Sequence, residues 1–162
     1  MREPRDNAGV IAPPPLIALL AVVLGLVLDW LLPAYVLSAL LTLTQRLVIG
    51  GVLMAAGLGL AFAANLSFRA AGTHPEPWKP ATALVTGGVF RTMRNPMYVG
   101  GTLFLAGLSI ALASSWMLVM TIFGALVLHF GVVKREERYL LAKFGDAYRR
   151  YLETVPRYGW PE

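Results

Sequence analysis

The sequence places several polar side chains where a loop would meet an apolar helix. The residues Arg94-Asn95-Pro96 precede an apolar run, and Tyr98 follows two positions later. Asparagine is a good N-cap and proline suits the first helical position, so we expect a helix to begin here. Its free N–H groups and positive dipole end would form an anion site, to which Arg94 would add a full charge. Taken alone, these residues equally fit a capped membrane helix with an interfacial arginine and tyrosine.

A second polar segment, Lys134–Pro156, follows the last apolar run. Glu136 lies seven residues after His129, so on a helix both side chains would point to nearly the same face. Gly145 can end this helix and Asp146 can cap the next one. Taken one by one, these charges are typical of an amphipathic helix that lies along anionic lipid headgroups.

Other kinds of chemistry have little support. Two ionisable residues, Asp29 and His129, fall inside apolar runs, where a functional role is the first hypothesis. Each lies within about one turn of the end of its run, so a structural role near the interface suffices. The sequence contains no cysteine, no H-x-x-x-H pair and no P-loop. We therefore expect no metal site, no thiol chemistry and no nucleoside triphosphate chemistry.

The composition indicates an integral membrane protein. Of the 162 residues, 57% are hydrophobic and 14% are charged, against roughly 45–50% and roughly 25% in soluble domains. This excludes a disordered tail, a coiled coil and an ordinary soluble enzyme. The net charge of +5 suits a membrane protein with basic residues on one side better than a nucleic-acid-binding protein.

Four apolar runs predict an all-α fold of about four transmembrane helices, because each would extend roughly 25–30 Å as a helix. The runs are Leu16–Leu32, Leu47–Leu66, Met97–Ala113 and Trp116–Val133. The segment Ala34–Arg46 between the first two would either lie in the interface or extend the second helix backwards.

Small residues are frequent in the second run. They are Gly50, Gly51, Ala55, Ala56, Gly57 and Gly59. This pattern either allows close helix packing or reflects the usual composition of membrane helices.

Basic residues predict the orientation. Thirteen of the fourteen lie before the first run, between the second and third, or after the fourth, and Arg46 alone lies on the other side. By the positive-inside rule, both termini and the long middle loop are expected in the cytoplasm, with the protein in the cytoplasmic (inner) membrane. Arg2 and Arg5 precede an apolar run too long for a signal peptide, which predicts an uncleaved first helix.

The region from about Phe68 to Pro156 resembles the isoprenylcysteine carboxyl methyltransferase family, which includes phospholipid methyltransferase relatives. Four blocks carry the resemblance in order: Ala83–Phe90, Arg94–Gly100, Arg135-Glu136-Glu137, and Phe144–Tyr148 with Val155-Pro156. Asn95 replaces the histidine of eukaryotic members, which is typical of bacterial relatives.

The resemblance implies a membrane methyltransferase that uses S-adenosylmethionine and a lipophilic acceptor entering from the bilayer. The acceptor would be a carboxylate or thiol of an isoprenylcysteine-like or other small lipophilic molecule. By position, the cofactor contacts would fall on Thr82, Ala83, Leu84, Val85, Phe90, Asn95, Pro96, Met97, Tyr98 and Glu136. The helix N-terminus suits the methionine carboxylate, and Glu136 can accept hydrogen bonds from ribose hydroxyls or the ammonium group. No catalytic base is implied, because transfer needs mainly alignment.

Two differences from the family concern the side chains. Phe90 replaces a tyrosine, and Val132 replaces the arginine that the family links to acceptor binding. The second change weakens the case for prenylcysteine as the acceptor and leaves the cofactor site intact. Two alternatives stay open: a phospholipid N-methyltransferase, and a non-catalytic membrane protein that retains the fold.

The expected organisation has three parts. Residues 1–15 would form a cytoplasmic tail and residues 16–66 the N-terminal transmembrane helices. Residues 67–162 would form the methyltransferase core, with a cytoplasmic loop (67–96), a helical hairpin (97–133) and cytoplasmic C-terminal helices (134–162).

Overall fold

The computed structural model describes residues 6–160, so the predicted tail residues Arg2 and Arg5 lie outside the described part. All regular elements within residues 6–160 are helical, as expected. They are α1 (Pro14–Leu31), α2 (Val36–Leu40), α3 (Leu43–Ala70), the 3-10 turn η1 (Gly88–Arg91), α4 (Pro96–Ala111), α5 (Ser115–Leu128), the π-helical turn η2 (His129–Val133), α6 (Lys134–Phe144) and α7 (Asp146–Thr154).

Long apolar helices confirm the integral membrane fold. Within the described residues, three are long and apolar enough to cross a membrane: α1, α3, and the continuous helix Ser115–Phe144. The fourth predicted span is the shorter apolar helix α4. Large apolar side chains such as Leu24, Phe62 and Phe123 are exposed, as lipid-facing residues must be.

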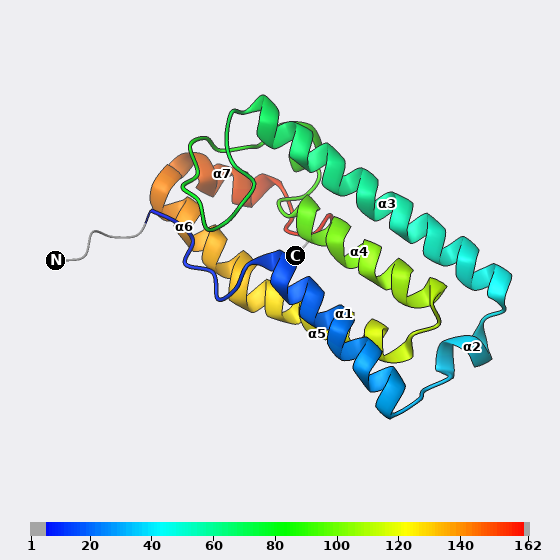
Figure 1. Ribbon diagram of the computed structural model, residues 1–162. Coiled ribbons are helices and arrows are strands. Elements are labelled where there is room, and N and C mark those ends of the chain that lie inside the picture. The colour runs from blue at the N-terminus through cyan, green and yellow to red at the C-terminus, as the bar shows by residue number, and fades with distance from the viewer. Residues whose placement is uncertain (1–5, 161–162) are drawn as a thin grey trace.

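The long helices lie side by side in a bundle. Helix α3 packs against α4, α4 against α5, and α5 against α1. One end of the bundle carries α6, α7 and the loop that follows α3, while α2 and the turn between α4 and α5 lie at the opposite end (Figure 1). The polar segments singled out in the sequence therefore gather at one end of the bundle.

The segment between the first two spans is predicted either to lie in the interface or to extend the second helix backwards. Neither alternative holds over its whole length. It contains the short helix α2, and α3 then begins at Leu43 with a capping box between Thr42 and Gln45. The second membrane helix thus starts earlier than predicted. It also continues beyond Leu66, to Ala70.

Asp29 has a structural role at the end opposite the polar segments. Its carboxylate accepts hydrogen bonds from the hydroxyl of Ser114 and, at 3.4 Å, from the backbone N–H of Trp116. Ser114 is the N-cap of α5. The negative charge of Asp29 therefore lies at the positive end of α5, where it is stabilising.

Helices α3 and α4 approach closely at two glycine pairs. A Cβ atom on Gly57 would lie 2.5 Å from the carbonyl oxygen of Gly100, and one on Gly50 would lie 2.6 Å from that of Gly107. Side-chain atoms do not fit in such gaps, so these glycines permit the contact. Gly51 and Gly59, by contrast, face open space, which confines the predicted close approach to one face of α3.

We expect Gly57→Ala to destabilise the protein by about 1–3 kcal/mol, because the added methyl group meets the backbone of α4. Gly59→Ala is the matched control in the same helix, and its effect should be neutral or slightly stabilising because alanine favours helix. Unfolding in detergent micelles measures both. Equal stabilities of the two variants would contradict the assignment of the α3–α4 contact to Gly57.

Candidate functional site

A polar cavity opens where the loop after α3 meets α6 and α7. The cavity together with the open space at its mouth measures about 690 Å³. Its lining includes Phe68, Thr73, Pro77, Ala83, Leu84, Val85, Phe90, Asn95, Glu136, Tyr139, Leu140 and Tyr148. We call it the polar cavity because carboxylate, amide and hydroxyl groups reach it beside the apolar side chains.

The structure brings six of the ten predicted cofactor residues to this cavity. They are Ala83, Leu84, Val85, Phe90, Asn95 and Glu136. Thr82 instead holds the loop: its N–H donates to Thr73 Oγ1 at 3.0 Å and its hydroxyl donates to the carbonyl of Gly72 at 3.2 Å. Pro96 is buried at the start of α4.

Phe90 anchors the loop to α7. Its buried ring meets Phe68 edge-on, with centroids 5.2 Å apart. The hydroxyl of Tyr151 donates to the carbonyl of Phe90 at 2.6 Å. Burial raises the pKa of Tyr151, so this hydroxyl keeps its proton at neutral pH. The apolar wall of the cavity is therefore fixed by a helix that follows it by about sixty residues.

Tyr98 and Glu136, two predicted site residues from different helices, are in direct contact. The phenol of Tyr98, in the first turn of α4, donates to Oε2 of Glu136 at 2.8 Å. Glu136 lies in the first turn of α6 and has no basic partner within residues 6–160. A partly buried carboxylate without a counter-ion is suited to a cationic or hydroxyl-rich ligand.

A second cavity lies on the other side of Tyr98. Including the open space at its mouth it measures about 910 Å³, and it is lined by α1, α4, α5 and the loop segment Pro75–Trp78. The lining includes Ile17, Ala18, Ala21, Met97, Tyr98, Gly101, Thr102, Leu105, Gly124, Ala125 and Leu128. We call it the apolar groove. Pro75, Glu76 and Pro77 line both cavities, so the two adjoin.

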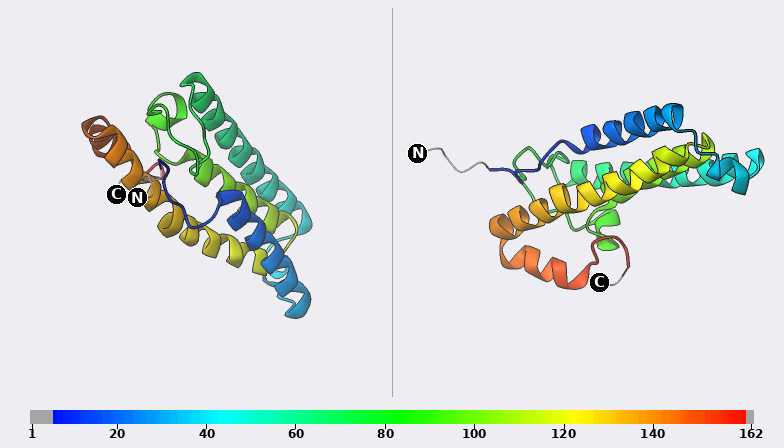
Figure 2. Two further views of the ribbon diagram at one scale, coloured as in Figure 1. Left: turned by 60° about the vertical axis from the view of Figure 1, so that its left-hand side comes forward. Right: turned by 90° about the horizontal axis from the view of Figure 1, so that it is seen from below.

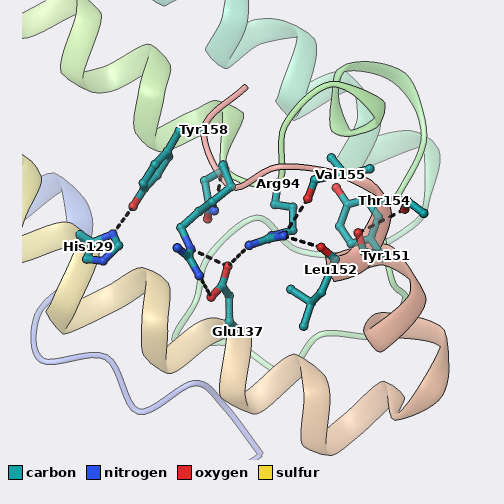
Figure 3. A network of polar contacts seen from close by, with 10 residues as sticks. Arg94, His129, Glu137, Tyr151, Leu152, Thr154, Val155 and Tyr158 are labelled. Carbon is teal, nitrogen blue, oxygen red and sulfur yellow. Dashed lines mark hydrogen bonds and ion pairs between the residues drawn. The ribbon is translucent and has the colours of Figure 1, made fainter. Parts of the chain in front are cut away.

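Arg94 contacts the C-terminal segment. Its guanidinium donates to the carbonyls of Leu152 and Val155 at 3.0 and 2.7 Å, and to Glu137 Oε1 at 3.0 Å (Figure 3). Only 6% of its side chain is exposed. Arg94 thus holds the C-terminal segment and also lines the polar cavity; the charge that it was expected to add beside the helix N-terminus stays a prediction.

The start of α4 at Asn95-Pro96 is confirmed, but the side-chain cap is not. Asn95 occupies the N-cap position without a side-chain cap bond. Its backbone N–H and its Nδ2 donate to the carbonyl of Arg157, at 3.2 and 3.3 Å. Arg157 in turn forms hydrogen bonds with both carboxylate oxygens of Glu137 at 2.9 Å. The Asn95 side chain thus donates to the C-terminal segment instead of accepting the amides of the first helical turn.

His129 also has a partner in the C-terminal segment. Its Nδ1 lies 2.7 Å from the hydroxyl of Tyr158 (Figure 3). Gly145 ends α6 as expected, with a positive φ of 53°. It is also the N-cap of α7, so the prediction that Asp146 caps this helix is wrong.

Tyr139 is a cavity residue that the sequence analysis missed. It follows Glu136 by three positions on the same helix, a spacing that puts both side chains on one face and could have revealed it. Its hydroxyl accepts a hydrogen bond from the N–H of Ala81 at 3.1 Å. Tyr148, which also lines the cavity, had no such signal because it belongs to a separate helix.

No group of three or more residues suited to hold a metal ion occurs in the part of the chain that the structure describes. The polar side chains that line the cavity belong to Thr73, His74, Glu76, Lys79, Arg94, Asn95, Glu136, Glu137, Tyr139, Tyr148 and Tyr151. Such groups recognise an organic ligand.

Comparison with known proteins gives the family. The family model for phospholipid methyltransferase matches residues 45–147. This chain belongs to that family. The match contains Tyr98, Glu136 and the cavity loop, and it confirms the resemblance inferred from the four sequence blocks.

One curated relative extends the family link. The protein-S-isoprenylcysteine O-methyltransferase of Schizosaccharomyces pombe is 37% identical over 76 residues, which cover 45% of this chain and 31% of the relative. The chain therefore matches about a third of the length of that relative. No solved structure gives a significant match.

Glu137→Ala should destabilise the protein by about 3–5 kcal/mol, because it removes a largely buried carboxylate that pairs with the guanidinium groups of Arg94 and Arg157. Glu153→Ala, at an exposed position of α7, should change stability by less than about 0.5 kcal/mol. Thermal unfolding in detergent compares the two. A Glu137→Ala protein as stable as the control would show that the ion pair does not hold the C-terminal segment.

Proposed function

We propose that this protein is a membrane-embedded methyltransferase that uses S-adenosylmethionine to methylate a lipophilic acceptor. Family membership makes it a methyltransferase; the methyl donor and the acceptor belong to the proposal. One observation carries it: a polar cavity and an apolar groove adjoin at the hydrogen-bonded pair Tyr98–Glu136. A polar methyl donor and an apolar acceptor need two such compartments with a shared boundary.

The residues of the polar cavity fit the proposed methyl donor. Glu136 has no basic partner in the described chain and can receive the ammonium group or the ribose hydroxyls. Leu84, Val85 and Phe90 supply an apolar wall for adenine. The methionine carboxylate would bind the first-turn amides of α4, since Met97 and Tyr98 have no acceptor within the helix.

The acceptor would occupy the apolar groove with its reactive atom near Tyr98. When bound, the donor supplies a methyl group already activated by the sulfonium. The residues of this chain then need to align the acceptor with that group and to exclude water. Small side chains at Ala18, Gly101 and Gly124 leave room for an apolar tail.

A phospholipid amine is the second candidate acceptor, and the charges around the groove favour it over a carboxylate. The charged residue among those lining the groove is Glu76, and none of its described lining residues is a lysine, arginine or histidine. Val132, at the position of the family arginine, is fully buried. An anionic acceptor would therefore lack a counter-ion, whereas a neutral or cationic headgroup would not need one.

The proposal extends to organisation and location. We propose residues 67–162 as the methyltransferase core, with residues 1–15 as a tail and 16–66 as supporting membrane helices. Helix α1 also lines the apolar groove, so the N-terminal region contributes to acceptor binding. The site end would face the cytoplasm from the cytoplasmic membrane, in keeping with the distribution of basic residues.

Calorimetry with S-adenosylmethionine and S-adenosylhomocysteine tests the methyl donor. We expect Glu136→Gln to weaken binding roughly 10- to 100-fold, because a hydrogen bond to a charged group is lost. The exposed Glu153→Gln serves as the control and should bind like the unaltered protein. Absence of binding in both detergent and lipid nanodiscs would overturn the proposal and favour a non-catalytic protein that retains the fold.

Filling the apolar groove tests the acceptor site. A side chain at Gly101 meets open space, so Gly101→Leu should fold, bind the methyl donor normally and lose most methyl transfer to phosphatidylethanolamine vesicles or to farnesylcysteine. Gly59→Leu makes the same change on α3, away from the groove, and should retain activity. Equal activities of the two variants would exclude the groove as the acceptor site.

A further inference from the structure

The chain segment before α1 crosses the polar cavity. Residues Asp6–Ala12, which we call the strap, run beside α6 and the cavity loop before they lead into α1 (Figures 1 and 2). Ala8 lies within the strap, is 9% exposed and contributes to the lining of the cavity. The strap is thus part of the cavity wall, although Ala8 precedes the next lining residue, Phe68, by sixty residues.

The outer end of the strap is held by Asp6. Its carboxylate receives hydrogen bonds from Lys143 Nζ at 2.7 and 2.8 Å and from the Tyr139 hydroxyl at 2.8 Å. Tyr139 also accepts the N–H of Ala81 in the cavity loop. Hydrogen bonds from Lys143 and Tyr139 lower the pKa of Asp6, so its carboxylate is ionised at neutral pH. Asp6 therefore connects the strap, α6 and the loop.

The middle of the strap is held by backbone groups. The N–H of Ala8 donates to the carbonyl of Pro77 at 3.3 Å. Arg135 Nη1 donates to the carbonyl of Gly9 at 3.0 Å. Since Pro77 belongs to the loop segment that lines both cavities, the strap closes directly onto their boundary.

The inner end rests on the π-helical turn η2. The N–H of Ile11 donates to the carbonyl of Gly131 at 3.2 Å. A Cβ atom on Gly131 would lie 2.6 Å from Cγ1 of Ile11. The absence of a side chain at Gly131 therefore leaves room for the isoleucine. A larger residue there requires the Ile11 side chain to move.

The contacts that hold the strap are weak enough to break and re-form. The Asp6 side chain is 58% exposed, and exposed ion pairs contribute little to stability. A segment held by a few exposed hydrogen bonds opens locally at a small free-energy cost. Behind it lies a cavity that a polar ligand must enter from water, whereas the groove is reached between apolar helices.

We propose that the strap is the lid of the polar cavity, and that its release at Asp6 and Ile11 admits and discharges the polar ligand. The identity of that ligand as the methyl donor and its demethylated product rests on the proposed function. The lid itself rests on the contacts of the strap alone, so the two can be tested separately.

Thiol labelling tests the lid without any ligand. The chain has no cysteine, so Ala81→Cys places a single thiol in the cavity wall beside Tyr139. Asp6→Ala in this background should raise the maleimide labelling rate roughly two- to fivefold, as expected for the loss of one weak surface contact. Gly131→Ala should act in the same direction, because it displaces Ile11. Equal labelling rates with and without Asp6→Ala would overturn the lid.

Two controls accompany the labelling. Asp146→Ala removes an exposed carboxylate on α7, whose contact with Arg149 is 3.9 Å long, and should leave the rate at Ala81→Cys unchanged. A thiol at the exposed Ala142→Cys should label at one rate in every background. A rate that rises equally at Ala142→Cys would indicate general loosening of the protein and would also overturn the lid.

The dissociation rate of a bound ligand distinguishes the lid proposal from the proposed function. If the unaltered protein binds S-adenosylhomocysteine, Asp6→Ala should raise its dissociation rate roughly two- to fivefold in stopped-flow measurements, and Asp146→Ala should not. Equal dissociation rates would overturn the lid while the proposed function stands. If the unaltered protein binds neither compound, the proposed function fails, and the labelling rates still decide the lid.

Discussion

The ion pair between Arg94 and Glu137 is the interaction on which the arrangement of the site depends. Arg94 ends the cavity loop, and its guanidinium joins Glu137 of α6 to two carbonyls at the end of α7. Because successive residues of a helix point about 100° apart, fixing Glu137 in this network turns its neighbour Glu136 toward Tyr98. One carboxylate of the pair stabilises the fold and the other is left to the site.

The packing of the long helices fixes the positions of the elements that this network joins. Glycines at the α3–α4 contact allow these helices to pack at backbone distance, as small residues do in membranes where apolar burial gives little driving force between helices. On another face of α4, Gly101 meets open space and lines the apolar groove. Glycines in a single helix thus serve two purposes, and their position on the helix decides which.

Two compartments of opposite character meet at one end of the bundle. The polar cavity is formed by the loop, α6, α7 and the strap, and the apolar groove by α1, α4 and α5. Such a division suits the proposed function, in which a water-soluble methyl donor and a lipophilic acceptor bind in separate compartments. The hydrogen-bonded pair Tyr98–Glu136 connects the two compartments, and Ala8 of the strap lines the polar one.

Local sequence patterns determined the membrane helices, the start of α4 at Asn95-Pro96, the break at Gly145 and the family blocks that contain Tyr98 and Glu136. These features depend on hydropathy, backbone preference and short spacings, all of which lie within a few turns of the chain. The role of Arg94, the partner of Asn95 and the position of the strap came only from the tertiary structure. Their partners lie between 43 and 137 residues away. Which distant polar groups meet is therefore decided only when the C-terminal segment and the strap pack over the end of the bundle.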